Sequence, residues 1–99
     1  MNIKKYGTKE LSKDYGPLTF GNALEAHRKC EEMSQKEFAL KLKISAQSLC
    51  DIEKGRRIPS PIRAAKIAKQ ISQPEKFWIQ LVFQDMLRRE QLNYTVSVA

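Results

Sequence analysis

The sequence predicts an all-α domain of five helices that ends in a short C-terminal β-strand. Three observations lead to this prediction. Apolar residues recur at helical spacing through most of the chain. Cap residues and prolines mark the successive helix starts. Only residues 93–98 alternate with the period of two that is typical of a strand.

The chain divides into three parts. Residues 1–17 contain glycines and a proline among polar residues, and we expect a flexible N-terminal arm there. Residues 18–91 carry the helical pattern, enough for one small domain. Residues 92–99 form a C-terminal strand or tail. Because a single strand is not stable alone, it would pair with a second subunit, join a partner's sheet or be disordered.

The first two helices have clear start signals. Thr19 is a good N-cap for a first helix that runs to about Glu32. Ser34 is followed three residues later by Glu37, which together form a capping box for the second helix. This second helix leads into a tight turn at residues 42–44.

The third and fourth helices are delimited in the same way. Ser45 caps the third helix, which covers about residues 45–53, and Gly55 supplies a left-handed C-cap. Ser60 caps the fourth helix, and the proline after it occupies the first helical position. The fourth helix runs to about Gln70.

The fifth helix, from about residue 74 to about residue 91, is apolar around more than half of its circumference. A helix of this kind is buried on more than one face. We expect one face to pack on the first and fourth helices. A second copy of the chain would cover the other face, unless the arm or the tail folds back over it. The residues assigned to this dimer interface are Phe77, Trp78, Leu81, Val82 and Met86.

The charge distribution favours a polyanionic partner. The net charge is +7, and residues 36–69 hold nine Lys or Arg against three acidic residues. The alternative is a basic surface that only confers solubility. No signal peptide and no apolar run of membrane-spanning length is present, so we expect a cytoplasmic protein without a membrane partner.

Catalysis and metal binding have little support in the sequence. Cys30 and Cys50 show neither zinc nor redox spacing, so we expect no metal and no cofactor, and we expect both thiols to be reduced and partly buried. His27 is the only histidine and lies among apolar neighbours. Since no nucleophile or Gly-rich phosphate loop is recognisable, an enzyme is not expected.

Three stretches of sequence carry a resemblance to a known family. They are residues 33–39 (MSQKEFA), 44–49 (ISAQSL) and 52–60 (IEKG, then IPS). In this order they resemble the Cro/cI (XRE) helix-turn-helix repressors, over roughly residues 20–80. The resemblance implies a lambda-repressor-like DNA-binding and dimerisation domain. As a homodimer, it would insert the third helix into the major groove of a near-palindromic operator and would be associated with the nucleoid.

The resemblance also implies roles for the exposed residues of the motif. Gln47 is the best base reader, because its amide can pair bidentately with adenine. The residues assigned to base reading are Ser45, Ala46, Gln47, Ser48 and Asp51. Those assigned to the phosphate backbone are Gln35, Lys36, Lys43, Lys54, Arg56 and Arg57.

Two structural expectations follow from the same resemblance. Arg28 and Glu53 stand where the family has an ion pair between the first and third helices; the alternative is two unpaired surface charges. Lys43 stands where the family often has Gly or Asn. Its backbone must therefore adopt an unusual conformation, at a cost of order 1 kcal/mol.

Small repressors of this kind are often antitoxins of type II toxin–antitoxin pairs, HigA/HipB-like in this case. The alternative function is therefore an antitoxin that neutralises a toxin by direct binding and autoregulates its operon. The segments at residues 1–17 and 93–98 would be available to hold such a toxin, because an added strand binds through main-chain hydrogen bonds.

Overall fold

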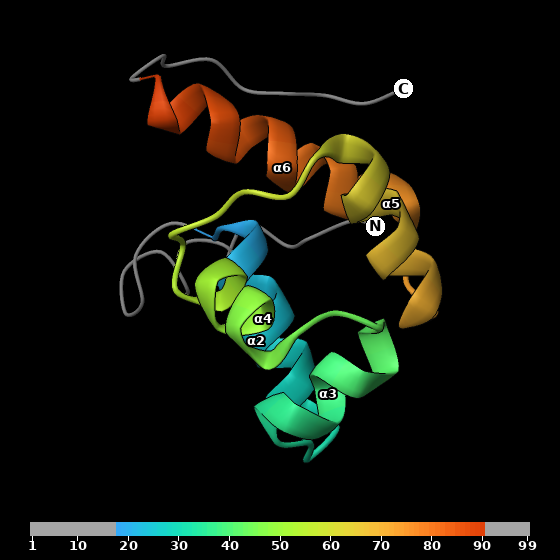
Figure 1. The fold of residues 1–99 in the computed structure, drawn as a ribbon. Helices are drawn as coiled ribbons and strands as arrows, with labels where there is room; N and C mark the ends of the chain where they lie inside the picture. The colour runs from blue at the N-terminus through green and yellow to red at the C-terminus, as the bar shows by residue number, and fades with distance from the viewer. Residues whose placement is uncertain (1–17, 91–99) are drawn as a thin grey trace.

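Five helices make up most of residues 18–90, which is the range that the computed structural model describes (Figure 1). They are α2 (Phe20–Cys30), α3 (Gln35–Leu42), α4 (Ala46–Glu53), α5 (Pro61–Gln70) and α6 (Glu75–Arg89). The predicted all-α class is confirmed for this range. The predicted arm at residues 1–17 and the predicted strand at 93–98 lie outside the described residues.

Four helices begin with a hydroxyl side chain that accepts a hydrogen bond from a backbone N–H three residues further on, as the sequence predicts. These caps are Thr19 for α2, Ser34 for α3, Ser45 for α4 and Ser60 for α5. The capping box at α3 is complete, since the side chain of Glu37 also accepts from the backbone N–H of Ser34 at 2.9 Å. Each start is therefore determined by residues close in sequence.

Helices α2 to α5 all end in a left-handed residue followed by a backbone hydrogen bond that reaches back into the last turn. At the end of α3, for example, the N–H of Lys43 donates to the carbonyl of Leu40 and that of Ile44 donates to Ala39. The left-handed residues are Glu32, Lys43, Gly55 and Ser72. The expected strain at Lys43 is confirmed (φ 59°, ψ 41°).

The end of α2 differs from the prediction by two residues. We expected the helix to continue to about Glu32, but it ends at Cys30 because Glu32 is itself left-handed (φ 56°). The next residue, Met33, donates its N–H to the carbonyl of Arg28 and packs its side chain against the core. A glycine would have signalled this ending in the sequence, but a glutamate does not.

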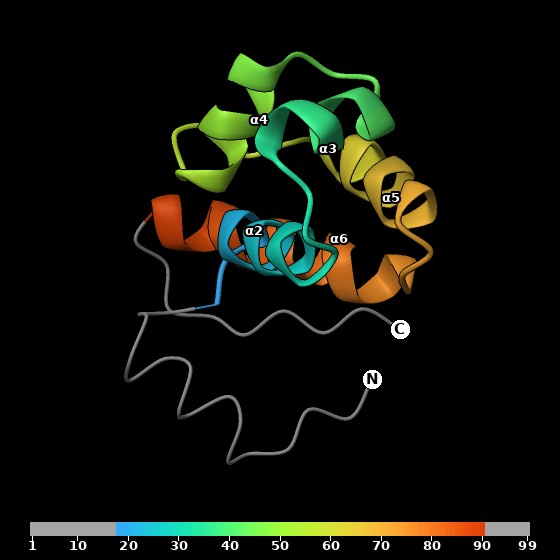
Figure 2. The same ribbon diagram turned by 90° about the horizontal axis from the view of Figure 1, so that it is seen from below.

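The helices form a closed ring of contacts. α2 packs on α4, α4 on α3, α3 on α5, α5 on α6, and α6 returns to α2 (Figures 1 and 2). The largest fully buried side chains come from every helix of the ring: Phe20, Leu24, Phe38, Leu42, Leu49, Ile67 and Val82. This shared core fixes the position of α4 from several sides.

Three of the residues assigned to a dimer interface lie instead inside the chain's own core. Trp78, Leu81 and Val82 are only 2%, 7% and 0% exposed. The ring of Trp78 meets that of Phe20 edge-on, with centroids 5.3 Å apart. This assignment is wrong for the three residues, because the face of α6 that carries them packs against α2 and α5 within the same chain. Of the remaining two, Phe77 is half-buried against the core, and Met86 is exposed.

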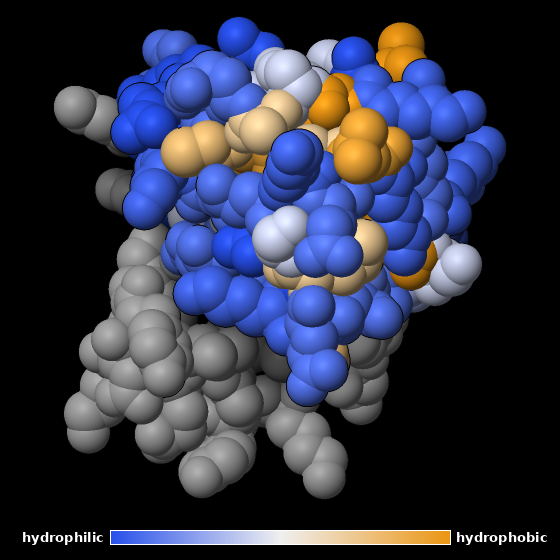
Figure 3. Space-filling view, turned by 60° about the horizontal axis from the view of Figure 1, so that its bottom comes forward, coloured by the Kyte–Doolittle hydropathy of each residue, from blue (hydrophilic) through white to orange (hydrophobic). Residues whose placement is uncertain are grey.

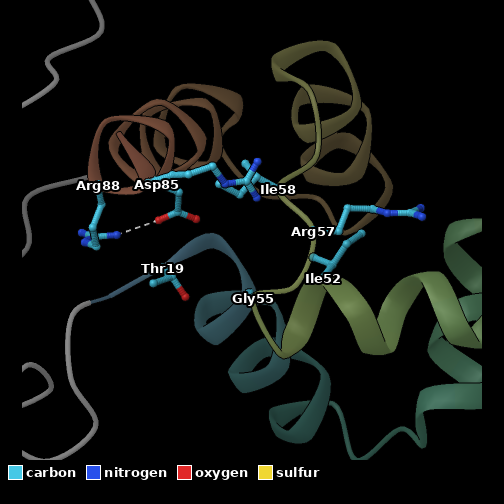
Figure 4. Close-up of a pocket in the computed structure, with 9 residues that line it drawn as sticks. Thr19, Ile52, Gly55, Arg57, Ile58, Asp85 and Arg88 are labelled. Carbon is cyan, nitrogen blue, oxygen red and sulfur yellow. Dashed lines mark hydrogen bonds and ion pairs between the residues drawn. The ribbon is translucent and has the colours of Figure 1, made fainter. Parts of the chain in front are cut away.

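Asp85 joins α6 to the start of α2. Its carboxylate accepts hydrogen bonds from the backbone N–H of Phe20 and from the guanidinium of Arg88, both at 3.0 Å, and Figure 4 draws the one from Arg88. Burial raises the pKa of the Asp85 carboxyl, and these two bonds offset part of the rise. An open hollow of about 220 Å³ lies beside it, where α2 begins and α4 ends.

The two cysteines are free thiols. Cys30 is exposed, which corrects the expectation that it is partly buried, whereas Cys50 is half-buried. Within residues 18–90, no cluster of three or more His, Cys, Asp or Glu side chains could hold a metal ion. No helix in that range has both the length and the apolar character needed to cross a membrane.

At Gly21 the backbones of α2 and α4 approach each other closely. A Cβ atom at this position would overlap the backbone carbonyl oxygen of Ile52 and press on that of Glu53. Glycine is unfavourable inside a helix, by roughly 1 kcal/mol relative to alanine. Its presence in the first turn of α2 is explained by this close crossing.

We predict that Gly21→Ala destabilises the protein by about 1–3 kcal/mol, because the added methyl forces α2 away from α4. Urea denaturation followed by circular dichroism measures this change. The control is Ala26→Gly at an exposed position of the same helix, which should lose about 1 kcal/mol through helix propensity alone. If Gly21→Ala were stabilising, as an ordinary helical Gly→Ala change is, the close crossing would not exist.

Candidate nucleic-acid interface

Helices α3 and α4 form the helix-turn-helix unit that the sequence predicts. The turn between them is closed by the left-handed Lys43, and Ile44 packs against the core. α4 then contacts α3 and also α2. Because Leu49 and Ile52 anchor its inner face, the opposite face of α4 is left on the surface.

The exposed face of α4 carries the residues predicted to read bases. Ser45, Ala46 and Gln47 are exposed, and Ser48 and Asp51 are half-buried. All five belong to the cap and body of one short helix, so they can enter a single groove together. The structure thus places Gln47, Ser48 and Asp51 on one exposed face of α4, and Ser45 and Ala46 at its exposed N-terminus.

Hydrogen bonds connect the longer side chains of this face. Asp51 Oδ1 accepts from the Gln47 amide nitrogen at 3.0 Å and from Arg56 Nε at 3.1 Å. The Arg56 guanidinium is the main cause of a lowered pKa at Asp51. The Ser48 hydroxyl accepts from Arg57 at 3.3 Å. The basic loop that follows α4 is therefore tied back onto the helix.

The cations predicted to bind phosphates come from α3, from the turn after it and from the loop that follows α4. Lys36 lies in the first turn of α3, Lys43 directly after its last residue, and the others follow α4 in the chain. All of them are exposed: Lys36, Lys43, Lys54, Arg56 and Arg57. Gln35 is different, because it is half-buried and its amide nitrogen donates to Glu53 Oε1 at 2.8 Å.

Arg63 is a further cation on this surface that the sequence motif did not indicate. It is exposed in the first turn of α5 and lines a hollow of about 240 Å³ together with Ser48 and Arg57. Its place three residues after the Ser60 cap is a signal that could have identified it, since helix N-termini favour anions.

Apolar side chains are sparse on the surface. Seen from the side on which α3 lies, the molecule is mainly hydrophilic, and its apolar patches are small (Figure 3). The exposed large apolar residues among the described ones are Leu40, Ile62, Phe83 and Met86. A polar, basic surface of this kind suits a polyanion better than an apolar ligand.

Arg28 and Glu53 form the expected ion pair, which is buried. Arg28 Nε donates to Glu53 Oε2 at 2.8 Å, and a second guanidinium nitrogen donates to Oε1 at 3.1 Å. The third guanidinium nitrogen donates to the carbonyl of Met33 at 3.0 Å. The hydrogen bonding that Arg28 donates to Glu53 is the main cause of a raised pKa at Arg28.

This ion pair connects all the segments that hold α4. Arg28 belongs to α2, Met33 to the turn that follows it, Gln35 to α3, and Glu53 to α4 itself. The two charged side chains are only 11% and 0% exposed, so each needs the other for compensation. The pair therefore sets the angle at which the exposed face of α4 is presented.

Comparisons with known proteins point to the same segment of the chain. A family model described as "Helix-turn-helix" matches residues 24–74. The "Endothelial differentiation-related factor 1 homolog" of Gallus gallus is 36% identical over 64 residues, which cover 65% of this chain and 43% of that protein. The chain thus spans less than half the length of this curated relative. No solved structure gives a significant match.

We predict that Glu53→Gln lowers the free energy of unfolding by about 3–5 kcal/mol, because the buried Arg28 loses its close counter-charge and keeps only the longer contact with Glu25 (3.9 Å). Chemical denaturation measures the loss. The matched control is Glu75→Gln, which breaks the exposed pair with Lys69 (3.6 Å) and should change stability by about 1 kcal/mol or less. Equal effects of the two changes would contradict a structural role for the buried pair.

Proposed function

Because the chain belongs to the helix-turn-helix family of the Cro/cI (XRE) type, we propose that it is a sequence-specific transcriptional repressor. Members of this family are DNA-binding regulators. The observation that carries the proposal is the exposed polar face of α4, held between α2 and α3 and surrounded by cations. A helix presented in this way fits the major groove of B-form DNA.

In the proposed complex, α4 enters the groove and the flanking cations bind the phosphate backbone. Gln47 is the principal base reader, since its amide offers both a donor and an acceptor to adenine. Ser45, Ala46 and Ser48 supply shorter contacts from the leading turn of the helix. The cations contribute affinity that depends on salt and little choice of sequence.

We propose that the repressor acts as a homodimer through the exposed face of α6. Phe83 and Met86 are 37% and 43% exposed and lie three residues apart, with the half-buried Ile79 one turn earlier. These residues share one helical face, which lies about a quarter-turn from the face of the buried Trp78 and Val82. A two-fold axis there would place two α4 helices one DNA turn apart and favour a near-palindromic operator.

The alternative function is an antitoxin, in which the same α6 face contacts a toxin. The exposed Phe83 and Met86 favour a protein partner of some kind, and DNA binding through α4 is common to both functions. A neighbouring gene that encodes a small basic nuclease or a kinase, together with co-purification of its product, would favour the antitoxin.

DNA binding is tested by selecting duplexes from a random pool and then titrating the selected duplex and a scrambled one. We expect a near-palindromic sequence to be enriched. The change Gln47→Ala should reduce discrimination between the two duplexes by about 1–3 kcal/mol, because the bidentate base contact is lost. Weak, equal binding of both duplexes by the wild-type protein would contradict the proposal and leave only electrostatic attraction.

The control for Gln47→Ala is Gln73→Ala, the same change at an exposed position between α5 and α6. It should leave both affinities unchanged. If Gln47→Ala weakens the two duplexes by the same factor, Gln47 does not read a base.

We predict that Phe83→Glu converts the dimer into a folded monomer, because the new charge would be buried in the interface but is tolerated on the surface of a single chain. Sedimentation equilibrium measures the mass, and circular dichroism confirms the fold. Ile62→Glu, at a position that is 84% exposed on α5, should remain dimeric. A wild-type monomer would contradict dimerisation, and a dimer that survives Phe83→Glu would place the contact elsewhere.

A further inference from the structure

Asp51 is engaged by two neighbours on the exposed face of α4. Its Oδ1 atom accepts hydrogen bonds from the amide nitrogen of Gln47, one turn earlier, and from Nε of Arg56 in the loop that follows. The side chain of Asp51 is 22% exposed, whereas that of Arg56 is 59% exposed. The carboxylate therefore lies low on this face, and both donors bind its Oδ1 atom.

A carboxylate accepts hydrogen bonds but does not donate them when it is ionised. The guanidinium of Arg56 lowers the pKa of Asp51, so the group is ionised at neutral pH. Gln47 can therefore approach Asp51 only with its NH2 group. Its carbonyl oxygen is turned away from the carboxylate, and one N–H remains free.

This orientation gives Gln47 a fixed order of one acceptor and one donor. In the major groove, adenine offers the N6 amino group as a donor and N7 as an acceptor, which match that order. Guanine offers two acceptors, O6 and N7, so the carbonyl of Gln47 would face the O6 atom of guanine. An amide that could turn freely would satisfy part of the guanine edge through its NH2 group.

We propose that Asp51 is a positioning residue for Gln47, which makes α4 prefer adenine to guanine at the base pair that Gln47 reads. This inference rests on the proposed DNA-binding function, and it replaces the role of Asp51 as a base reader. Asp51 acts through the amide of Gln47. Its own charge is compensated by Arg56.

The ion pair also restrains Arg56. A guanidinium held by Asp51 is partly neutralised, so it attracts a DNA phosphate less strongly than a free one. Asp51 therefore has two effects on binding. It increases the preference for adenine at the base pair that Gln47 reads, and it lowers the general attraction for DNA. A residue that only stabilised the fold would produce neither effect.

The test is the change Asp51→Asn, measured on the selected duplex and on a duplex with adenine replaced by guanine at the Gln47 position. That position is identified as the one whose preference is lost in Gln47→Ala. Asparagine keeps the shape but offers either a donor or an acceptor, so the amide of Gln47 can turn. We expect an adenine preference of about tenfold in the wild type to fall to about twofold.

Binding of Asp51→Asn to a scrambled duplex supplies a second readout. Its dependence on salt should steepen, by up to about 0.9 in the log–log slope, as Arg56 is released to a phosphate. Asp51→Glu keeps an ionised acceptor and should retain most of the adenine preference. The matched control for loss of a carboxylate is Glu75→Gln, whose ion pair with Lys69 lies away from α4 and which should change neither readout.

The possible outcomes separate this inference from the proposed function. If the wild-type protein selects no sequence, the proposed function and the positioning role of Asp51 both fail. Suppose that selection succeeds and that Gln47→Ala loses the preference for adenine at one base pair. If Asp51→Asn keeps the full preference at that base pair, only the positioning role of Asp51 is overturned. A loss of preference at a different base pair in Asp51→Asn would also overturn it, because Asp51 would then read a base itself.

Discussion

Helix α2 lies against the end of α4 so closely that Gly21 touches the carbonyl of Ile52, and two turns later Arg28 binds the carboxylate of Glu53. These two contacts hold α4 from one side, while α3 holds it from the other. A change of a few degrees in the crossing angle between α2 and α4 would displace every side chain on the exposed face of α4. The buried ion pair and the missing Cβ atom are therefore the constraint on which the DNA-binding geometry depends.

The exposed face of α4 is organised by a second, weaker set of contacts. Asp51 connects Gln47 to Arg56, and Ser48 connects the first turn of the helix to Arg57. Hydrogen bonds between exposed side chains contribute little to stability, but they limit the orientations that a base reader can adopt. In the proposed complex, α2 sets the position of α4. The polar residues of α4 and of the loop after it set the direction of the Gln47 amide.

Helix α6 illustrates how an apolar pattern can be read correctly and still be assigned to the wrong surface. The pattern predicts burial on more than one face, and Trp78 is indeed buried. Periodicity alone does not distinguish a face that covers the chain's own core from a face left for a partner. The closed ring of helices assigns Trp78 and Val82 to the core and leaves Phe83 and Met86 exposed.

The sequence by itself determined the helix starts, the end at Gly55, and the face that α4 exposes, because these depend on residues within about one turn of each other. Family resemblance indicated the Arg28–Glu53 pair and the unusual conformation of Lys43. Only the tertiary structure decided the crossing at Gly21, the contact between Asp85 and Phe20, 65 positions apart, and which side of α6 is buried. These contacts join segments that approach one another only after packing, and no local pattern records such distances.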